Sequence, residues 1–253
     1  MLALIDIGNT TIAIGLTTDY QQIQKILKIN TEKNKSSDEY ALILDGMLHD
    51  IDAAMISSVV PELNDTFREY FVARFGFQPL FLGAGIKTGI KVNSDNPKEV
   101  GADLIANAVS ATVNYGKTVL VVDLGTATTF TYVENLTIRG VAIATGLTTS
   151  KNALISKTSL LPQIELEAPT KLLGTNSVDS IKSGVVYGHA SMIDGMIRRI
   201  KKNLKNLELP VIMTGGHSKI VAPLCEEPLI IDETLIIKGL LVIFGLNRDR
   251  FGR

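Results

Sequence analysis

Two short segments of the chain share an arrangement of residues that could bind phosphate. The first, 4–14, contains Asp6 and Gly8, and the second, 121–131, contains Asp123. In each segment an apolar run ends in Asp, followed by an apolar residue, Gly and hydroxyl-bearing residues. Glycine lets the backbone approach a ligand, successive turn amides bind anions, and a carboxylate can hold a cation against phosphates. We therefore expect the two segments to hold one polyphosphate from opposite sides.

The alternative is that each segment is an ordinary β-hairpin, because Asp-x-Gly is common in turns. One copy would not decide between these interpretations. A repeat of the pattern, each time at the end of a buried type of strand, favours a pair of phosphate-binding turns.

A third candidate is Asp103, near the start of a predicted helix. Asn96 is expected to cap this helix, with Pro97 at its first position and Glu99 three residues after the cap. The stretch after it has an apolar stripe and a polar stripe, and Asp103 belongs to the polar, accessible one. It could accept a proton from a substrate hydroxyl. A surface carboxylate favoured by the helix dipole is the alternative, and spacing alone favours that alternative.

Of two further glycine-containing segments, one could contact a ligand and the other is not expected to bind a nucleotide. Gly215 and Gly216 follow a predicted strand, where bare backbone could pack against a flat ligand such as an adenine ring, although such loops often need Gly for conformation alone. Segment 111–118 nearly matches a P-loop, but it follows a helix and opens a strand, the reverse of a P-loop. Lys117 in it is interpreted as a solvated turn residue.

Strand-like and helix-like stretches alternate along the chain, which is typical of an α/β protein. The runs predicted as strands are 2–6, 53–60, 118–123 and 210–213. The stretches with helical spacing are 37–48, 62–75 and 192–207. Because the repeat divides the 253 residues into similar parts, we expect an N-terminal lobe over 1–116 and a C-terminal lobe over 117–253.

Charge and composition exclude several classes of protein. Lys and Arg total 25 against 26 Asp and Glu, a formal net charge of -1, which argues against nucleic acid or an anionic membrane as the main partner. The basic residues of 198–205 are therefore interpreted as a solvated helix face. One cysteine, Cys225, and three scattered histidines exclude an internal disulfide and argue against a Cys/His zinc site.

The chain start lacks the basic region of a secretory signal. Its longest apolar runs, such as 239–245, fall short of the ~18 to 20 residues of a membrane helix. We therefore expect a soluble, cytoplasmic protein.

Several motifs, in order and over nearly the whole chain, resemble the type III pantothenate kinases of the acetate and sugar kinase, chaperone ATPase and actin superfamily. These motifs are Asp6–Thr10, Ser57–Pro61, Asn96–Asp103, Asp123–Thr129, Ser183–Gly188 and Thr214–Gly216. The resemblance implies two related ribonuclease H-like lobes with ATP in the cleft between them, usually in a homodimer. It also implies phosphorylation of the primary hydroxyl of pantothenate, the first step of coenzyme A biosynthesis.

The resemblance further implies roles for single residues. The first ATP-phosphate loop would consist of Asp6, Ile7, Gly8, Asn9, Thr10, Thr11, Ile12 and Ala13. Thr126 would contact ATP, which binds with magnesium, and Asp123 would bind the monovalent cation of the family, potassium or ammonium. The pantothenate site would comprise Gly101, Ala102, Asp103, Leu104 and Ser177, with Asp103 as the proton acceptor.

The acceptor side departs from the family pattern. The family motif continues Gly-Ala-Asp-Arg, but Leu104 stands where Arg is usual and cannot replace its charge or its donors. Ser94 stands where many members have Tyr, and Thr145 where Pro usually precedes Gly. We expect an active pantothenate kinase with weaker acceptor binding. The alternatives are a nucleotide-binding relative with a regulatory role, or a kinase for another small hydroxylated acceptor.

Overall fold

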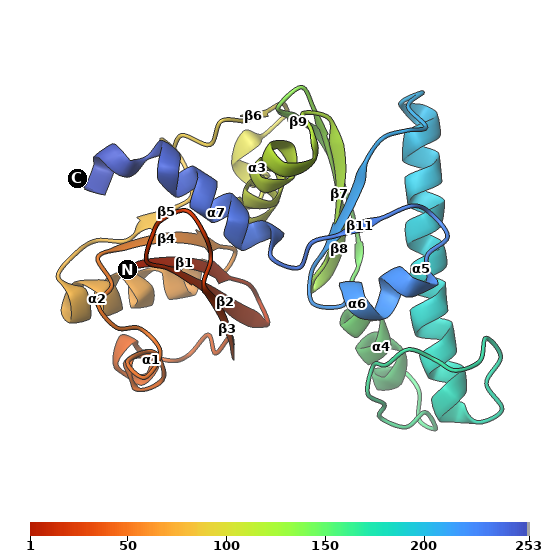
Figure 1. Cartoon of the computed structure of the whole chain (residues 1–253). Helices are drawn as coiled ribbons and strands as arrows, with labels where there is room; N and C mark the ends of the chain where they lie inside the picture. Colours follow the sequence, from red (N-terminus) through yellow and green to blue (C-terminus); the bar gives the residue numbers. More distant parts are fainter. Residues whose placement is uncertain (252–253) are drawn as a thin grey trace. The chain divides into compact units, whose positions relative to one another are not determined.

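A computed structural model describes residues 1–251, and Gly252 and Arg253 lie outside the described residues. The chain forms two compact units (Figure 1). The first unit consists of residues 1–114 together with 234–253, and the second of residues 115–233. Among residues 1–251, no helix combines the length and apolar composition needed to cross a membrane.

The first unit is built on a five-stranded sheet with the order β3-β2-β1-β4-β5. Its strands are β1 (Leu2–Ile7), β2 (Thr11–Thr17), β3 (Lys25–Asn30), β4 (Ala53–Ser58) and β5 (Leu80–Phe81). The short β6 (Lys91–Val92) follows them in the chain but is not part of this sheet. β1, β2 and β3 are antiparallel neighbours, whereas β4 runs parallel to β1 and β5 parallel to β4. Its helices are α1 (Ser37–Leu44), α2 (Asn64–Phe75), α3 (Ala102–Tyr115) and α7 (Leu235–Leu246).

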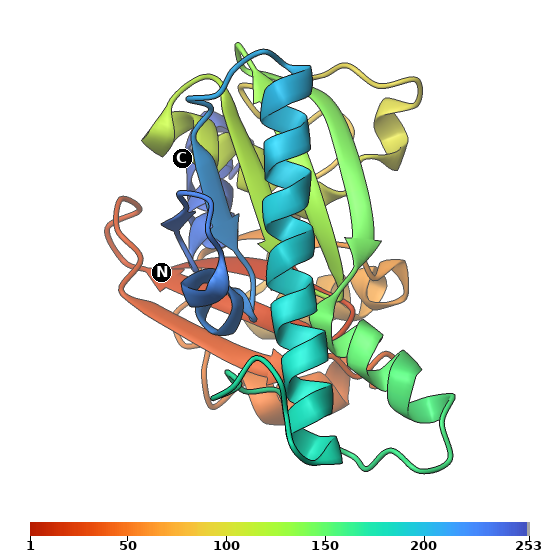
Figure 2. The same cartoon turned by 90° about the vertical axis from the view of Figure 1, so that its right-hand side faces the viewer.

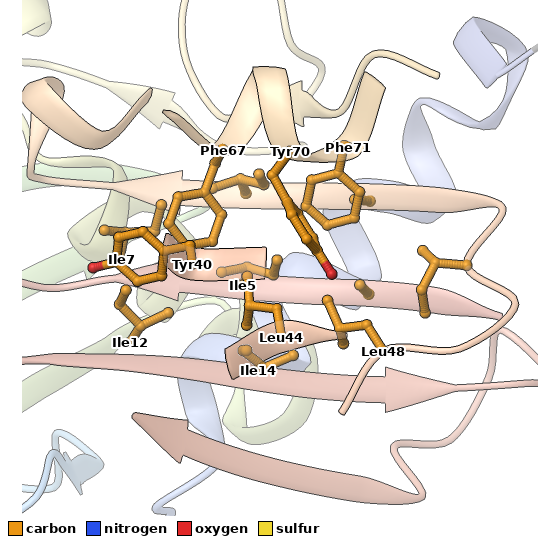
Figure 3. Packing of buried hydrophobic residues seen from close by; sticks show 14 of the residues in the cluster. Ile5, Ile7, Ile12, Ile14, Tyr40, Leu44, Leu48, Phe67, Tyr70 and Phe71 are labelled. Carbon is orange, nitrogen blue, oxygen red and sulfur yellow. The ribbon is translucent and has the colours of Figure 1, made fainter. Parts of the chain in front are cut away.

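Both faces of this sheet are buried because successive strand residues point to opposite sides. On one face Ile5 and Ile7 of β1 pack with aromatic residues of α1 and α2, including Tyr40 and Phe67 (Figure 3). On the other face Leu2 and Leu4 pack with apolar residues of α3 and α7. The continuous apolar sequence of β1 reflects this two-sided burial.

The second unit repeats this topology. Its strands are β7 (Val119–Leu124), β8 (Ala127–Glu134), β9 (Thr137–Thr145), β10 (Val211–Thr214) and β11 (Ile230–Ile231). Their order is β9-β8-β7-β10-β11, again three antiparallel strands followed by two parallel ones. Its helices are α4 (Leu147–Ser156), α5 (Ser177–Asn203) and the short α6 (Ser218–Val221). The long α5 covers one face of this sheet (Figure 2). The predicted α/β fold with two related ribonuclease H-like lobes is confirmed.

The sequence alignment of the two copies is one residue out of register after the turn. Three residues, 8–10, separate β1 from β2, whereas only 125 and 126 separate β7 from β8. As a result Asp6 lies opposite Ala13, but Asp123 lies opposite Thr129 and not opposite the Phe130 that the alignment implies.

The predicted second lobe, 117–253, is wrong at its C-terminal end. Residues 234–253 belong to the first unit, where α7 covers one face of the sheet. α7 is apolar on nearly every side, and its Leu240 and Phe244 pack in one cluster with Leu4 and Met55. Its residues return to the first unit because only this helix, with α3, covers that sheet face among the described residues.

The two segments that enter and leave the second unit are joined by a hydrogen bond. The hydroxyl of Tyr115 donates to Oδ2 of Asp232 over 2.9 Å. Burial, together with this carboxylate, raises the pKa of Tyr115 to about 12, so the phenol stays protonated. The two connecting segments therefore start and end the second unit side by side.

Several local predictions are confirmed and others are corrected. The four predicted strands and the helices near 37–48 and 62–75 exist, and segment 111–118 runs from helix to strand with Lys117 exposed. The predicted helix start at Asn96 is wrong. Pro97–Glu99 forms a separate 3-10 turn and Val100 is extended, with φ -75° and ψ 116°, so α3 begins at Ala102. The predicted helical stretch 192–207 overlaps the second half of α5, which begins earlier, at Ser177, and ends earlier, at Asn203.

The close packing of α7 on α3 leaves no room for a side chain at Gly239. A side chain at Gly239 would overlap the backbone of Ala106, whereas Gly245 on the same helix faces open space. We expect Gly239→Ala to lower the free energy of unfolding by about 1 to 3 kcal/mol, because backbone atoms cannot yield. Gly245→Ala should be neutral or stabilise by up to about 1 kcal/mol. Urea unfolding measures both, and equal effects would contradict this packing.

Candidate active site

The aspartates of the repeat occupy equivalent places in the two sheets. Asp6 lies near the end of β1, with Ala13 of β2 on one side and Ser57 of β4 on the other. Asp123 lies near the end of β7, between Thr129 of β8 and Thr214 of β10. Each carboxylate is therefore at the end of a central strand, directly before a tight turn.

Hydroxyl groups beside these carboxylates are buried without a partner. Among the described residues, neither Oγ of Ser57 nor Oγ1 of Thr129 has a hydrogen-bond partner, although both atoms are buried. An unmet buried hydroxyl costs about 1 to 3 kcal/mol, so a ligand that supplies its partner would gain stability there. This orphaned pair could not be seen in the sequence, because only the strand register brings each hydroxyl beside its aspartate.

The donor set fits a cation that is shared with a ligand. Carboxylate and hydroxyl oxygens suit magnesium and other hard cations. Among residues 1–251, no group of three or more His, Cys, Asp or Glu side chains could hold a metal ion. A cation at either aspartate would therefore need further oxygen ligands from bound phosphate or water.

The first turn presents backbone and hydroxyl groups to solvent. The amide of Gly8 donates to the carbonyl of Thr11 over 3.1 Å, and Asn9, Thr10 and Thr11 are exposed. Ile7 and Ile12 are fully buried, so only their backbone could meet a ligand. Sequence reasoning missed Lys33, whose Nζ donates to Oδ1 of Asn9 over 3.1 Å and brings a positive charge to this turn.

The second turn is held by the start of α4. The amide of Gly125 donates to the carbonyl of Ala127 over 3.0 Å, and the hydroxyl of Thr149 donates to the carbonyl of Thr126 over 2.8 Å. A side chain at Gly146 would overlap the carbonyls of Gly125 and Thr126, so the start of α4 lies directly against the turn. Thr126 itself is exposed.

Gly215 and Gly216 follow β10, and the surrounding structure requires a glycine only at Gly215. Gly215 has φ 94°, and a side chain there would come within 2.5 Å of Oδ1 of Asp123 and 2.6 Å of the backbone of Leu124. Packing against the end of β7 therefore requires this glycine. Gly216 is exposed, with open space around its Cα, so an adenine ring against it stays a prediction.

Asp103 lies in the first turn of α3 and is partly exposed. Its Oδ1 accepts the backbone N–H of Leu104 over 2.8 Å, and a side chain at Gly101 would overlap its carboxylate. Burial raises the pKa of Asp103, and the backbone hydrogen bonds offset only part of this effect. A carboxylate with a raised pKa is a better proton acceptor than an ordinary one.

The polar stripe predicted on α3 is not a surface stripe. Asn107 and Ser110 are buried, with exposed fractions of 1% and 0%, so the accessible part near the helix start is Asp103. Leu104 is also buried, and Ala102 is partly exposed beside it. Hydrophobic spacing could not reveal this, since burial of the polar face depends on tertiary packing.

Ser177 is exposed at the first position of α5, directly after Asn176, whose side chain accepts from the N–H of Asp179 and caps the helix. Ser177 lines a cavity of about 860 Å³ within the second unit. The same cavity is lined by His189, which sequence reasoning assigned to no role. Its signal in the sequence is weak, because a single His in an amphipathic helix is common in protein cores.

The chain is similar to known proteins over nearly its whole length. The family model of type III pantothenate kinase matches residues 2–199. A type III pantothenate kinase of Finegoldia magna is 41% identical over 259 residues, covering 98% of this chain and 98% of that protein. One of Halalkalibacterium halodurans is 39% identical over 255 residues, covering 98% of this chain and 100% of that protein.

Solved structures of lower identity share the fold. A Baf-family protein of Campylobacter jejuni, named as a transcriptional activator, superposes with a TM-score of 0.62 at 19% identity over 98% of this chain and 99% of its own. The activator of 2-hydroxyisocaproyl-CoA dehydratase from Clostridium difficile, solved with bound ADPNP, superposes with a TM-score of 0.56 at 12% identity over 98% and 96%. These likenesses show the architecture alone.

The raised pKa of Asp103 predicts a pH-dependent stability difference. Because burial raises this pKa above 3.8 in the folded chain, the folded state binds the proton more readily than the unfolded state. Stability contributed by the protonated form is then lost as pH rises through the raised pKa. We expect the wild type to lose stability relative to Asp103→Asn as the pH rises above about 4, measured by urea unfolding. A difference that stays constant with pH would contradict the raised pKa.

Proposed function

Because the chain belongs to the type III pantothenate kinase family, we propose that it transfers the γ-phosphoryl group of ATP to the primary hydroxyl of pantothenate. This reaction is the first step of coenzyme A biosynthesis. The observation that carries the proposal is the pair of equivalent aspartate turns, each with an unpartnered hydroxyl beside its carboxylate. Phosphoryl transfer needs mainly positioning and charge neutralisation, which such turns can supply.

The nucleotide is assigned to the turn residues. The segment Asp6–Ala13 is proposed as the first phosphate loop, with Gly8 to Thr11 offering exposed backbone and hydroxyl groups and Ile7 and Ile12 acting through their backbone. Thr126 is proposed to contact ATP from the second turn. Lys33, through its contact with Asn9, adds positive charge that the phosphates require.

Cations would complete the charge balance. The formal net charge of -1 leaves no large positive field to attract ATP, so neutralisation must be local. Asp123, with the hydroxyl of Thr129 beside it, is proposed to hold potassium or ammonium, and Asp6 and Asp123 are carboxylates that fit the hydrated shell of magnesium. Bound cations supply neutralisation of charge on the phosphate oxygens.

Asp103 is proposed as the catalytic proton acceptor. The hydroxyl oxygen of pantothenate forms a bond to the γ-phosphorus, while the bond from that phosphorus to the bridging oxygen of ADP breaks. The hydroxyl proton passes to the carboxylate of Asp103. Burial raises the pKa of this carboxyl, which suits it to receive a proton as the alcohol becomes acidic.

The acceptor side is proposed to comprise Gly101 to Leu104 and Ser177. Leu104 offers no charge or donor to the pantothenate carboxylate, so binding is expected to be weaker than with Arg. The same observation supports two other functions, a nucleotide-binding regulatory relative and a kinase for another hydroxylated acceptor. The pantothenate kinase is favoured because Asp103 and both aspartate turns are retained.

A homodimer in the cytoplasm is proposed as the working state. Several large apolar side chains of the second unit are exposed, including Leu160 at 93%, Leu173 at 83% and Ile143 at 71%. Burial of such side chains against a second chain would remove apolar area from water, which favours association. They support a second copy as the partner.

Removal of the Asp103 carboxylate tests the reaction. We expect Asp103→Asn to lower kcat about 10²- to 10⁴-fold, with little change in the KM for ATP, because the variant cannot accept the proton. A coupled assay of ADP release with pantothenate, saturating ATP and potassium measures this. Asp65→Asn, whose side chain is 88% exposed, is the matched control and should keep full activity. Wild-type turnover no higher than that of Asp103→Asn would exclude the kinase.

Replacement of Leu104 tests the acceptor. If pantothenate is the acceptor, Leu104→Arg should raise kcat/KM for pantothenate about tenfold to a hundredfold, because it restores a charge-assisted contact. Leu104→Met, which keeps the side chain apolar, should stay near the wild type. Thermal unfolding of both variants controls for the buried position. Activity gained with another acceptor, but not with pantothenate, would favour the alternative kinase.

A further inference from the structure

A buried hydrogen bond links α5 to the second aspartate turn. Oγ1 of Thr128 lies 2.9 Å from Nε2 of His189, and the two residues are 0% and 6% exposed. Thr128 pairs in register with Leu124, so the turn 125–127 is the loop that this pair closes. His189 therefore contacts the residue on which the geometry of the turn depends.

The surroundings of His189 favour its neutral form. Burial lowers its pKa, and the neighbouring His217 lowers it further. A neutral imidazole can accept the hydroxyl proton of Thr128 or donate to its oxygen, and neither arrangement introduces a buried charge. The bond is therefore suited to position the turn and not to take part in acid–base chemistry.

The cavity of about 860 Å³ shares its walls with the supports of the turn. α4, whose Thr149 bonds to the carbonyl of Thr126, contributes Ser150 and Leu154 to the lining, and α5 contributes His189. A ligand in the cavity would thus touch both helices that hold the turn. Because a buried bond fixes His189 to Thr128, a change in the position of α5 would also move Thr128.

The chemistry of the lining restricts what the cavity can take. The residues that line it, all within the described part of the chain, include no Asp, Glu, Lys or Arg. They provide hydroxyl groups from Ser150, Ser177 and Ser180, the imidazole of His189, and apolar surface from Leu154 and Met192. This lining fits an uncharged group that carries hydroxyls or an amide and has an apolar part.

We propose that His189 is a positioning residue that couples occupancy of this cavity by an uncharged, hydroxyl- or amide-bearing group to the conformation of the turn 125–127. The inference rests on the proposed function, in which Thr126 of this turn contacts ATP and Ser177 of the cavity contacts the acceptor. Pantothenate carries such a group between its primary hydroxyl and its carboxylate. Its binding and nucleotide binding should strengthen each other, because coupling between two sites is reciprocal.

The test measures the affinity of the full chain for a non-hydrolysable ATP analogue by calorimetry, with and without saturating pantothenate. We expect pantothenate to tighten nucleotide binding about fivefold or more in the wild type. In His189→Leu the ratio of the nucleotide affinities with and without pantothenate should fall to about 1. His189→Gln, whose amide can reach Thr128, should keep the wild-type ratio. Ser180→Ala removes a hydroxyl from the cavity lining without touching the turn. It should weaken pantothenate binding but leave the ratio at saturation unchanged.

A second pair of variants keeps the test decisive if His189→Leu fails to fold. In Thr128→Val the ratio of the two affinities should fall to about 1. Thr128→Ser should retain the wild-type ratio, since only the serine keeps the hydroxyl. A wild-type ratio near 1, or an unchanged ratio in both His189→Leu and Thr128→Val, would overturn the inference. Pantothenate turnover in the wild type distinguishes this result from failure of the proposed function, which would show no turnover.

Discussion

The candidate site depends on one constraint: an aspartate must lie near the end of a strand that pairs with a neighbouring strand on both sides. Asp6 and Asp123 each occupy such a position, with neighbours fixed by the register of the adjoining strands. Pairing on both sides leaves the backbone of the strand no freedom, so the following turn leaves the sheet in a defined direction. The hydroxyls, the glycines and the supporting helices are all arranged around this end of the sheet.

Both units meet this constraint, but the residues around their two turns differ. The first turn is one residue longer and has Lys33 near it, whereas the second is tighter and is held by Thr149 and Gly146. Asp6 has Ala13 as one neighbour, but Asp123 has a hydroxyl residue on both sides. The second turn therefore offers more oxygen ligands, which agrees with the proposal of a monovalent cation at Asp123.

The fold could be predicted from the sequence where local pattern decides it. The apolar runs of β1 and β7, each ending in Asp and followed by Gly, indicate the repeat and the α/β class. Features that depend on tertiary contacts could not be predicted. The extended conformation of Val100 delays the start of α3, and burial of Asn107 converts an apparent surface stripe into packing. The location of Asp103 near a helix start and of Thr126 in a turn could be predicted, but the orphaned hydroxyls and the bond of His189 arise from register and helix packing.

The return of α7 to the first unit has a consequence for the order of events during synthesis. The face of the first sheet that carries Leu2 and Leu4 is covered by a helix at the far end of the chain. A nascent chain that has emerged only to residue 114 has α3 but not α7 to cover this apolar face, whereas residues 115–233 are one continuous segment. The unit whose synthesis begins first is thus completed last.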